Sequence, residues 1–186
     1  MDEQRLEYPG TAHFAAAVYT HHVTNREALS EFAEELKQQN VRVGGLIQEV
    51  MFDQTGRKIG IDIVEVDTGN RIPINRPSKE NIEGHTCSLN TEKLADSTEA
   101  LRRAVRERFD LIILEKFGER EQNGQGLMDE IFLAISEEIP LLIAVPKPAL
   151  PLWQEKSGDL GDTLEFDLDV FRQWWKTKSS VPANRA

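Results

Sequence analysis

The stretch from Asp110 to Gly126, DLIILEKFGEREQNGQG, constrains the fold of this chain more than any other. It opens with four consecutive apolar residues at 111–114, a run that is too short for a globular helix and fits a fully buried strand. The run ends in the charged pair Glu115 and Lys116, and a glycine-bearing polar loop follows before an amphipathic helix begins at Leu127. Open α/β sheets place their ligands at the carboxyl ends of such strands, so we predict a site here. The alternative is that the charged pair only marks the point where the strand meets solvent.

The composition describes a globular protein and excludes two classes of partner. The 186 residues are 39% hydrophobic and 29% charged, with a formal net charge of −10. Such a charge repels a nucleic-acid backbone or an anionic membrane, and no apolar run approaches the ~20 residues of a membrane span. An anionic ligand would need local donors that overcome the overall negative charge.

The length fits one domain with a sizeable core. We expect this domain at residues 13–176, after an extension at 1–12 and before a disordered tail at 177–186. The acidic start MDEQRLEYPG lacks the basic and then apolar pattern of a secretory signal, and Cys87 is the single cysteine. These features predict a cytoplasmic protein.

Hydrophobic periodicity predicts strands and helices that alternate along most of the chain. We expect strands at 13–19, 41–52, 58–67, 72–74, 111–114 and 140–145, and helices at 25–39, 89–108, 126–138, 149–156 and 168–175. Thr24 is expected to cap the first helix with Glu27 completing a capping box, and Asn90 or Thr91 to cap the second. Gly44 and Gly45 indicate a bulge or a close backbone approach. The strands between 41 and 74 are expected to form an antiparallel meander attached to a parallel sheet.

Two sets of motifs resemble known families. The segments GGLIQEV at 44–50 and GRKIGIDIV at 56–64, with Thr68-Gly69, resemble the small P-loop nucleoside-triphosphatases first described from thermophiles and related to the human cancer-related enzyme. The second set resembles a divergent bacterial branch of unknown function, often linked with molybdate-type transport genes. It comprises Lys116-Phe117-Gly118, Glu121, Gly124, Gly126, Ile139-Pro140 and Cys87-Ser88-Leu89.

The resemblance runs from Phe14 to Trp175. It implies a three-layer, P-loop-NTPase-like α/β fold with a mostly parallel sheet and a β-hairpin or meander insertion. It also implies a nucleotide or a molybdate-type or tungstate-type oxyanion as ligand, and a homo-oligomer or a transport-related protein as partner.

The first loop departs from the pattern of that class. A phosphate-binding loop reads G-x-x-x-x-G-K-[ST], whereas residues 19–27 read YTHHVTNRE, without glycine or lysine. We therefore interpret it as a degenerate Walker A loop, in which Arg26 offers a cation and Thr20 or Thr24 a hydroxyl. The resemblance implies an acidic pair after the strand at 111–114 that handles magnesium and water. Here only Glu115 remains, and Lys116 beside it opposes a divalent cation, which argues against ordinary ATP or GTP hydrolysis.

Lys116 is the candidate replacement for the missing lysine. Together with backbone N–H groups of Gly118, Gly124 and Gly126, it could hold a phosphate or another oxyanion. The alternative is that Lys116 pairs with Glu121 or Glu49 and only fixes the loop.

A second candidate constellation consists of His21, His22, His85 and Cys87. If the loop at 76–87 folds over the first loop, these groups could bind zinc, copper or nickel, with His85 and Cys87 as the main ligands. Alternatively, His21 and His22 could bind an anion, or all four residues could be ordinary loop and core residues. Trp153 could pack near a base, although simple packing is favoured, and core docking or a subunit contact is favoured for Trp174 and Trp175.

The leading functional hypothesis is a non-hydrolytic anion-binding module for a nucleotide or an oxyanion. Its binding residues would be Thr20, His21, His22, Thr24, Arg26, Lys116, Gly118, Gly124 and Gly126. One alternative is a slow nucleoside-triphosphate phosphohydrolase that uses magnesium and has Glu115 acting on water. The other is a structural adaptor without a small ligand.

Overall fold

The computed structural model of the protein describes residues 12–75 and 91–179, with side chains in the second range from residue 97 onward. Seven strands and seven α-helical or 3₁₀ segments are described in these ranges. The strands are β1 (Phe14–Tyr19), β2 (Val43–Phe52), β3 (Lys58–Glu65), β4 (Arg71–Asn75), β5 (Leu111–Leu114), β6 (Leu141–Pro146) and β7 (Asp162–Glu165). The helices are α1 (Ala28–Gln38), α3 (Thr91–Arg106), α4 (Glu119–Gln122), α5 (Met128–Ser136), the 3₁₀ turn η1 (Lys147–Ala149), α6 (Leu150–Lys156) and α7 (Leu168–Ser179).

All seven strands form one sheet in the order β4-β3-β2-β5-β6-β1-β7. The strands β2, β5, β6, β1 and β7 pair in parallel, whereas β3 and β4 join by antiparallel pairing. The buried run 111–114 therefore lies near the middle of the sheet as β5, and the expected antiparallel meander is confirmed as β2-β3-β4. The α/β class and the mostly parallel sheet predicted from the sequence are confirmed.

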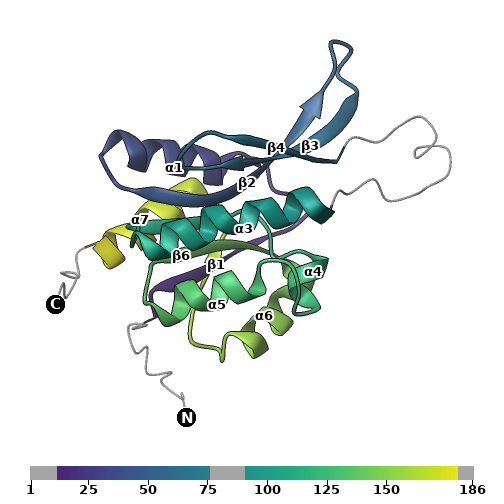
Figure 1. The fold of residues 1–186 in the computed structure, drawn as a ribbon. Helices are drawn as coiled ribbons and strands as arrows, with labels where there is room; N and C mark the ends of the chain where they lie inside the picture. The colour runs from purple at the N-terminus through teal and green to yellow at the C-terminus, as the bar shows by residue number, and fades with distance from the viewer. Residues whose placement is uncertain (1–11, 76–90, 180–186) are drawn as a thin grey trace.

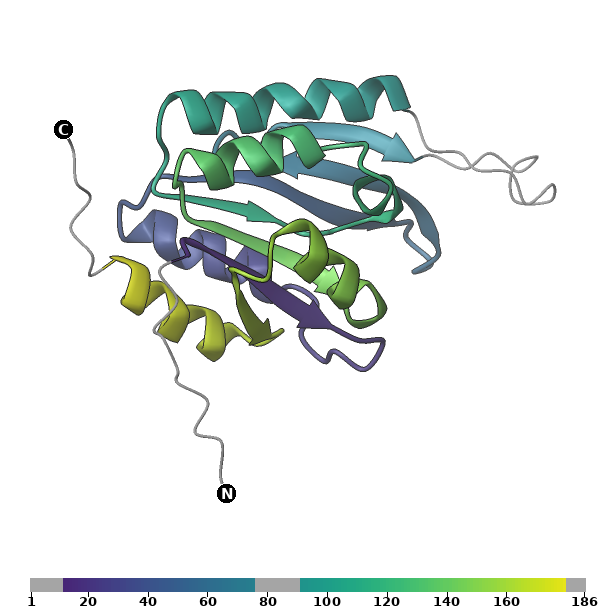
Figure 2. The same cartoon turned by 90° about the horizontal axis from the view of Figure 1, so that it is seen from below.

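Helices cover both faces of the sheet and produce three layers (Figures 1 and 2). α1 and α7 pack on one face, where Phe32, Phe171 and Trp174 join Ile113 and Leu142 in one apolar cluster. α3, α5 and α6 pack on the other face around a second cluster. Within the described ranges, no helix is long and apolar enough to cross a membrane.

Gly44 and Gly45 bring β2 close to its neighbours. A Cβ atom on Gly44 would lie 2.8 Å from the ring of Phe109, and one on Gly45, whose φ is +115°, would lie 1.9 Å from the carbonyl oxygen of Ile113. Only glycine tolerates both the conformation and the distance at position 45. The close backbone approach predicted from the sequence is confirmed.

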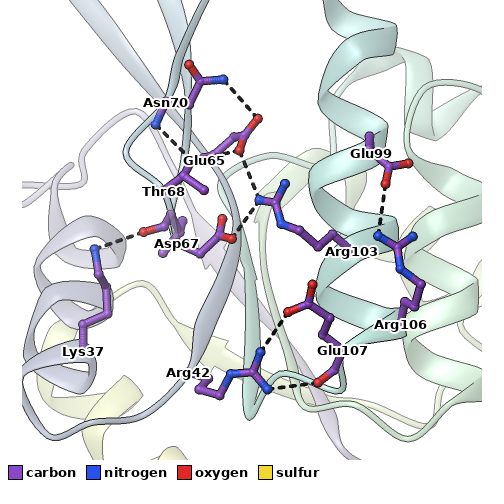
Figure 3. A network of polar contacts seen from close by, with 11 residues as sticks. Lys37, Arg42, Glu65, Asp67, Thr68, Asn70, Glu99, Arg103, Arg106 and Glu107 are labelled. Carbon is purple, nitrogen blue, oxygen red and sulfur yellow. Dashed lines mark hydrogen bonds and ion pairs between the residues drawn. The ribbon is translucent and has the colours of Figure 1, made fainter.

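A network of ion pairs lies beside the amino end of β2, where α1 and α3 end (Figure 3). Arg103 donates to Asp67 at 2.7 Å and to Glu65 at 3.1 Å. Thr68 and Asn70 also donate to the Glu65 carboxylate, and Arg42 pairs with Glu107 at 3.0 Å. Each charged side chain of this network therefore has a partner of opposite charge.

Four sequence predictions need correction. Thr24 does not cap α1, because the helix begins only at Ala28, and Asn25 Oδ1 instead accepts from the Glu27 N–H at 3.0 Å. The short polar strand β7 and the single turn α4 were missed, and α7 extends to Ser179, so helix continues past the expected boundary at residue 176. The expected caps Asn90 and Thr91 lie outside the described side chains.

Candidate functional site

A cavity of about 220 Å³ opens at the carboxyl end of the sheet, on the face covered by α1. Strands β1, β2, β5 and β6 and the loop before α1 all contribute to its walls. The lining residues are Tyr19, Thr20, His21, Val23, Arg26, Gln48, Glu115, Lys116, Ala144 and Phe166. The site predicted beyond β5 therefore coincides with a cavity at the position where open α/β sheets bind ligands.

Arg26 and Lys116 line this cavity without a carboxylate partner among the described side chains. Among the described side chains, at 12–75 and 97–179, no acidic oxygen lies within 4.0 Å of the charged nitrogens of Arg26 or Lys116. Both side chains are exposed, and His21 adds an imidazole from the same loop. In a chain of net charge −10, two unpaired cations at one cavity create a local positive region.

Glu115 forms the acidic part of the wall. Its Oε2 accepts the backbone N–H of Gln48 at 2.6 Å, while its own N–H donates to Leu46. Burial raises the pKa of Glu115 to about 7; the Gln48 N–H and Lys116 oppose this rise, and the charge of Glu49 adds to it. Burial, followed by the charge of Glu115, also raises the pKa of Tyr19. The carboxyl group is therefore poised to change charge near neutral pH.

The loop that resembles a Walker A position is closed by its own hydrogen bonds. Thr20 accepts the N–H of His22 on its hydroxyl at 3.2 Å and the N–H of Val23 on its carbonyl at 3.3 Å. Asn25 accepts the N–H of Glu27. These three N–H groups therefore donate within the loop itself and are not available to a ligand.

The glycine loop after β5 is built around one buried carboxylate, Glu121. Its two oxygens accept the N–H groups of Gly118 at 3.0 Å and Leu127 at 3.1 Å, and its carbonyl accepts the N–H of Gly124. Gly126 has φ +64°, and a Cβ atom there would lie 2.1 Å from Glu121 Oε1. The glycines accommodate Glu121, and the Gly118 and Gly124 N–H groups expected to hold an anion already have an acceptor.

The alternative prediction, in which Lys116 pairs with Glu121 or Glu49, is wrong for both partners. Glu121 is occupied by backbone N–H groups, and Glu49 pairs with Arg71 at 2.6 Å. Lys116 thus remains available to the cavity.

The structure brings together only part of the predicted site. Thr20, His21, Arg26, Glu115 and Lys116 line the cavity, whereas His22, Thr24, Gly124 and Gly126 do not, and Gly118 borders a different cavity. His85 and Cys87 lie outside the described residues; in the described part, no three His, Cys, Asp or Glu side chains gather as a metal site. Trp153 is buried between Phe14 and Phe117, which confirms simple packing.

Sequence reasoning missed five lining residues, namely Tyr19, Val23, Gln48, Ala144 and Phe166. Tyr19 is the last residue of a strand that was predicted, so its position at the carboxyl edge was accessible from the sequence. Phe166 follows β7, whose sequence DTLE carries too weak an apolar signal to be recognised as a strand.

A family model described as "Protein of unknown function (DUF2478)" matches residues 14–174. The chain belongs to this family. It is also 34% identical over 152 residues to the "Molybdenum import ATP-binding protein ModC 2" of Bradyrhizobium diazoefficiens. The match covers 82% of this chain but only 17% of that protein, so the chain spans a small part of its relative.

The fold is similar to that of THEP1 from the hyperthermophile Aquifex aeolicus. The two structures match with a TM-score of 0.58 over 84% of this chain and 90% of THEP1, at 16% sequence identity. This likeness confirms the P-loop-NTPase-like fold expected from the sequence, and at this identity it concerns the fold alone.

Proposed function

We propose that this protein is a non-hydrolytic binding module for a small anion, either a nucleotide phosphate group or a tetrahedral oxyanion such as molybdate or tungstate. The observation that carries the proposal is the convergence on one cavity of Arg26 and Lys116, neither of which has a carboxylate partner among the described side chains. Arginine and lysine donate charge-assisted hydrogen bonds to oxyanions. His21 and Thr20 add two further polar side chains from the same loop.

Binding without turnover is favoured by the groups around Glu115. A phosphoryl-transfer site positions a metal and a water with carboxylates, but Lys116 next to Glu115 opposes a divalent cation at this position. Below about pH 6 the raised pKa also keeps Glu115 largely neutral. A neutral carboxyl can donate a hydrogen bond to an anion, whereas a carboxylate repels it.

The relative's description guides the choice of ligands. That relative is a molybdenum import ATP-binding protein, so molybdate and ATP are the first candidate ligands for this chain. A transport-related protein in the cytoplasm is the first candidate partner. This support is associational, since the match covers a small part of that relative.

The test is thermal unfolding against phosphate, sulfate, molybdate, tungstate and nucleotides, followed by calorimetry with each ligand that stabilises. A ligand at 100 times its dissociation constant adds about 2.7 kcal/mol to the free energy of unfolding. We expect Arg26→Ala and Lys116→Ala to abolish the shift. Arg57→Ala and Lys176→Ala, which remove exposed cations outside the cavity, serve as matched controls. A flat response to the whole panel contradicts the proposal and favours an adaptor without a small ligand.

A second candidate function, a slow nucleoside-triphosphate phosphohydrolase, is favoured by one observation. A carboxyl with a pKa of about 7 beside a cavity has the properties of a general base. The variant Glu115→Gln separates the two functions. A hydrolase loses magnesium-dependent phosphate release, whereas a binding module binds its anion more tightly at pH 8, because a negative charge has been removed from the wall.

A further inference from the structure

A second cavity of about 260 Å³ lies across the carboxyl edge of the sheet, on the face covered by α3 and α5. Its walls are mostly aliphatic, from β2, β3, β4, β5 and the end of the glycine loop. The apolar lining residues are Leu46, Ile61, Ile63, Ile74, Leu114 and Leu127. Such walls favour an apolar group and offer little for recognition by hydrogen bonds.

The two cavities meet at a short wall of three residues. Gln48, Glu115 and Lys116 line both of them. Glu115 is held in this wall by the Gln48 N–H, while Lys116 is exposed and lacks a carboxylate partner in the described chain. Lys116 thus contributes to both the cationic cavity and the apolar one.

The polar rim of the second cavity shows that it does not simply repeat the first. Glu121 is there, but both of its carboxylate oxygens accept backbone N–H groups. Arg120 also lines the rim, and its buried Nε has no hydrogen-bond partner in the described structure. Because Glu115 and Glu119 line this cavity as well, its rim carries charges of both signs around an aliphatic interior.

We propose that both cavities accept one ligand, an oxyanion ester with an apolar substituent. The anionic group would bind among Arg26, His21 and Lys116, and the substituent would cross the Gln48–Lys116 wall into the aliphatic cavity. This inference rests on the proposed anion binding and deepens it, because it assigns the natural ligand to organic phosphates or similar esters instead of a bare oxyanion. Burial of the apolar substituent supplies affinity that an inorganic ion lacks.

The test compares inorganic phosphate with phenyl, 2-phenylethyl and 4-phenylbutyl phosphate by calorimetry on the full chain. The series varies the length of the linker between the phosphate and the ring, because the ring must pass the wall formed by Gln48, Glu115 and Lys116 to enter the aliphatic cavity. We expect at least one ester to bind at least tenfold more tightly than phosphate. We also expect phosphate to displace that ester completely, because the two share the cationic cavity.

Two variants assign the parts of the ligand. Ile61→Phe, at a half-buried position, fills the aliphatic cavity and should reduce ester affinity to that of phosphate while leaving phosphate binding unchanged. Arg26→Ala should weaken phosphate and ester alike. If Ile61→Phe does not fold, saturation transfer from isoleucine and leucine methyl groups of the wild-type protein to the ester ring replaces it.

The outcomes separate this inference from the proposed function. Binding of phosphate with no gain for any ester overturns the inference and leaves the anion site intact. Ester binding that phosphate does not displace also overturns it, because it means two independent sites. Absence of binding by every member of the series, together with a flat response to the other anions, overturns both.

Discussion

The two ends of the sheet treat positive charge in opposite ways. At the amino end of β2, Arg103 is held by Glu65 and Asp67, and hydrogen bonds surround Glu65 (Figure 3). At the carboxyl end, Arg26 and Lys116 line a cavity without a carboxylate within 4.0 Å in the described chain. The first arrangement stabilises the fold, and the second leaves two exposed cations beside a cavity. The anion that we propose would supply the negative charge that the second arrangement lacks.

The carboxylates follow the same division. Although burial raises the pKa of Glu65, hydrogen bonds from Thr68, Asn70 and Arg103 hold it below its usual range. The pKa of Glu115 rises to about 7, because burial outweighs the single backbone donor and Lys116. The pKa of the buried Glu65 and the pKa of the half-buried Glu115 are therefore shifted in opposite directions.

The largest expected effect follows from breaking the ion-pair network at the amino end of β2. Arg103→Ala leaves Glu65 and Asp67 without their shared cation, and removal of one partner from such a partly buried network costs about 3 kcal/mol. Urea unfolding at pH 7 measures this loss. The matched control is Arg106→Ala, one turn along α3, whose exposed pair with Glu99 contributes about 0.5 kcal/mol or less. Equal losses in the two variants would contradict the assignment.

The pH dependence of stability gives the next largest effect. Since the folded pKa of Glu115 lies above its unfolded value of 4.5, its contribution is present below pH 4.5 and is lost as the pH rises to about 7. After discounting for partial exposure, we expect wild type to lose about 2 kcal/mol over this range relative to Glu115→Gln. Glu65→Gln should show the opposite trend, because stability from Glu65 is lost as the pH falls. Parallel pH profiles for the two variants would refute the contrast.

A smaller effect is expected on ligand affinity. Sulfate, whose charge is constant between pH 6 and 8, should bind about fivefold more weakly at pH 8 than at pH 6, because Glu115 ionises in the wall. The variant Glu115→Gln should reduce this dependence at least by half. An unchanged slope in the variant would mean that another group controls the pH response. Calorimetry at both pH values, at constant ionic strength, measures the ratio.

The smallest expected effect is on the stability of the ligand-free protein when a cation of the cavity is removed. Arg26→Ala and Lys116→Ala should change the free energy of unfolding by less than about 0.5 kcal/mol without ligand, since both side chains are exposed and neither pairs with a described carboxylate. The same variants should lose the stabilisation by anions. A loss above 1 kcal/mol in the absence of ligand would show that these residues support the fold as Arg103 does.

The sequence predicted the parts of the fold that depend on long apolar runs. β5 and β6 are continuous aliphatic segments, and Gly44-Gly45 could be interpreted because few other features require two adjacent glycines in a strand. β7 was missed because an edge strand of four residues with partly exposed side chains has almost no periodic signal. The Thr24 cap failed because Asn25 offers a competing local acceptor one residue later.

The charged residues of the candidate site could be predicted from the sequence, but their arrangement in space could not. Glu115, Lys116 and Arg26 could be chosen from their positions after strands. The role of Glu121 could not, because nothing in the loop sequence distinguishes an acid that binds two backbone N–H groups from a solvated one. Likewise, the convergence of Gln48 and Phe166 depends on strand order, which brings together residues from distant parts of the chain.

Gly45 links the interior of the sheet to the acid in the cavity. Its missing side chain lets β2 lie against Ile113, two residues before Glu115, and three residues further along β2 is the Gln48 N–H that Glu115 accepts. The distance between β2 and β5 at Gly45 therefore determines the length of that hydrogen bond. A larger residue at position 45 would push the two strands apart, and the proton affinity of Glu115 would change although no charged atom had been altered.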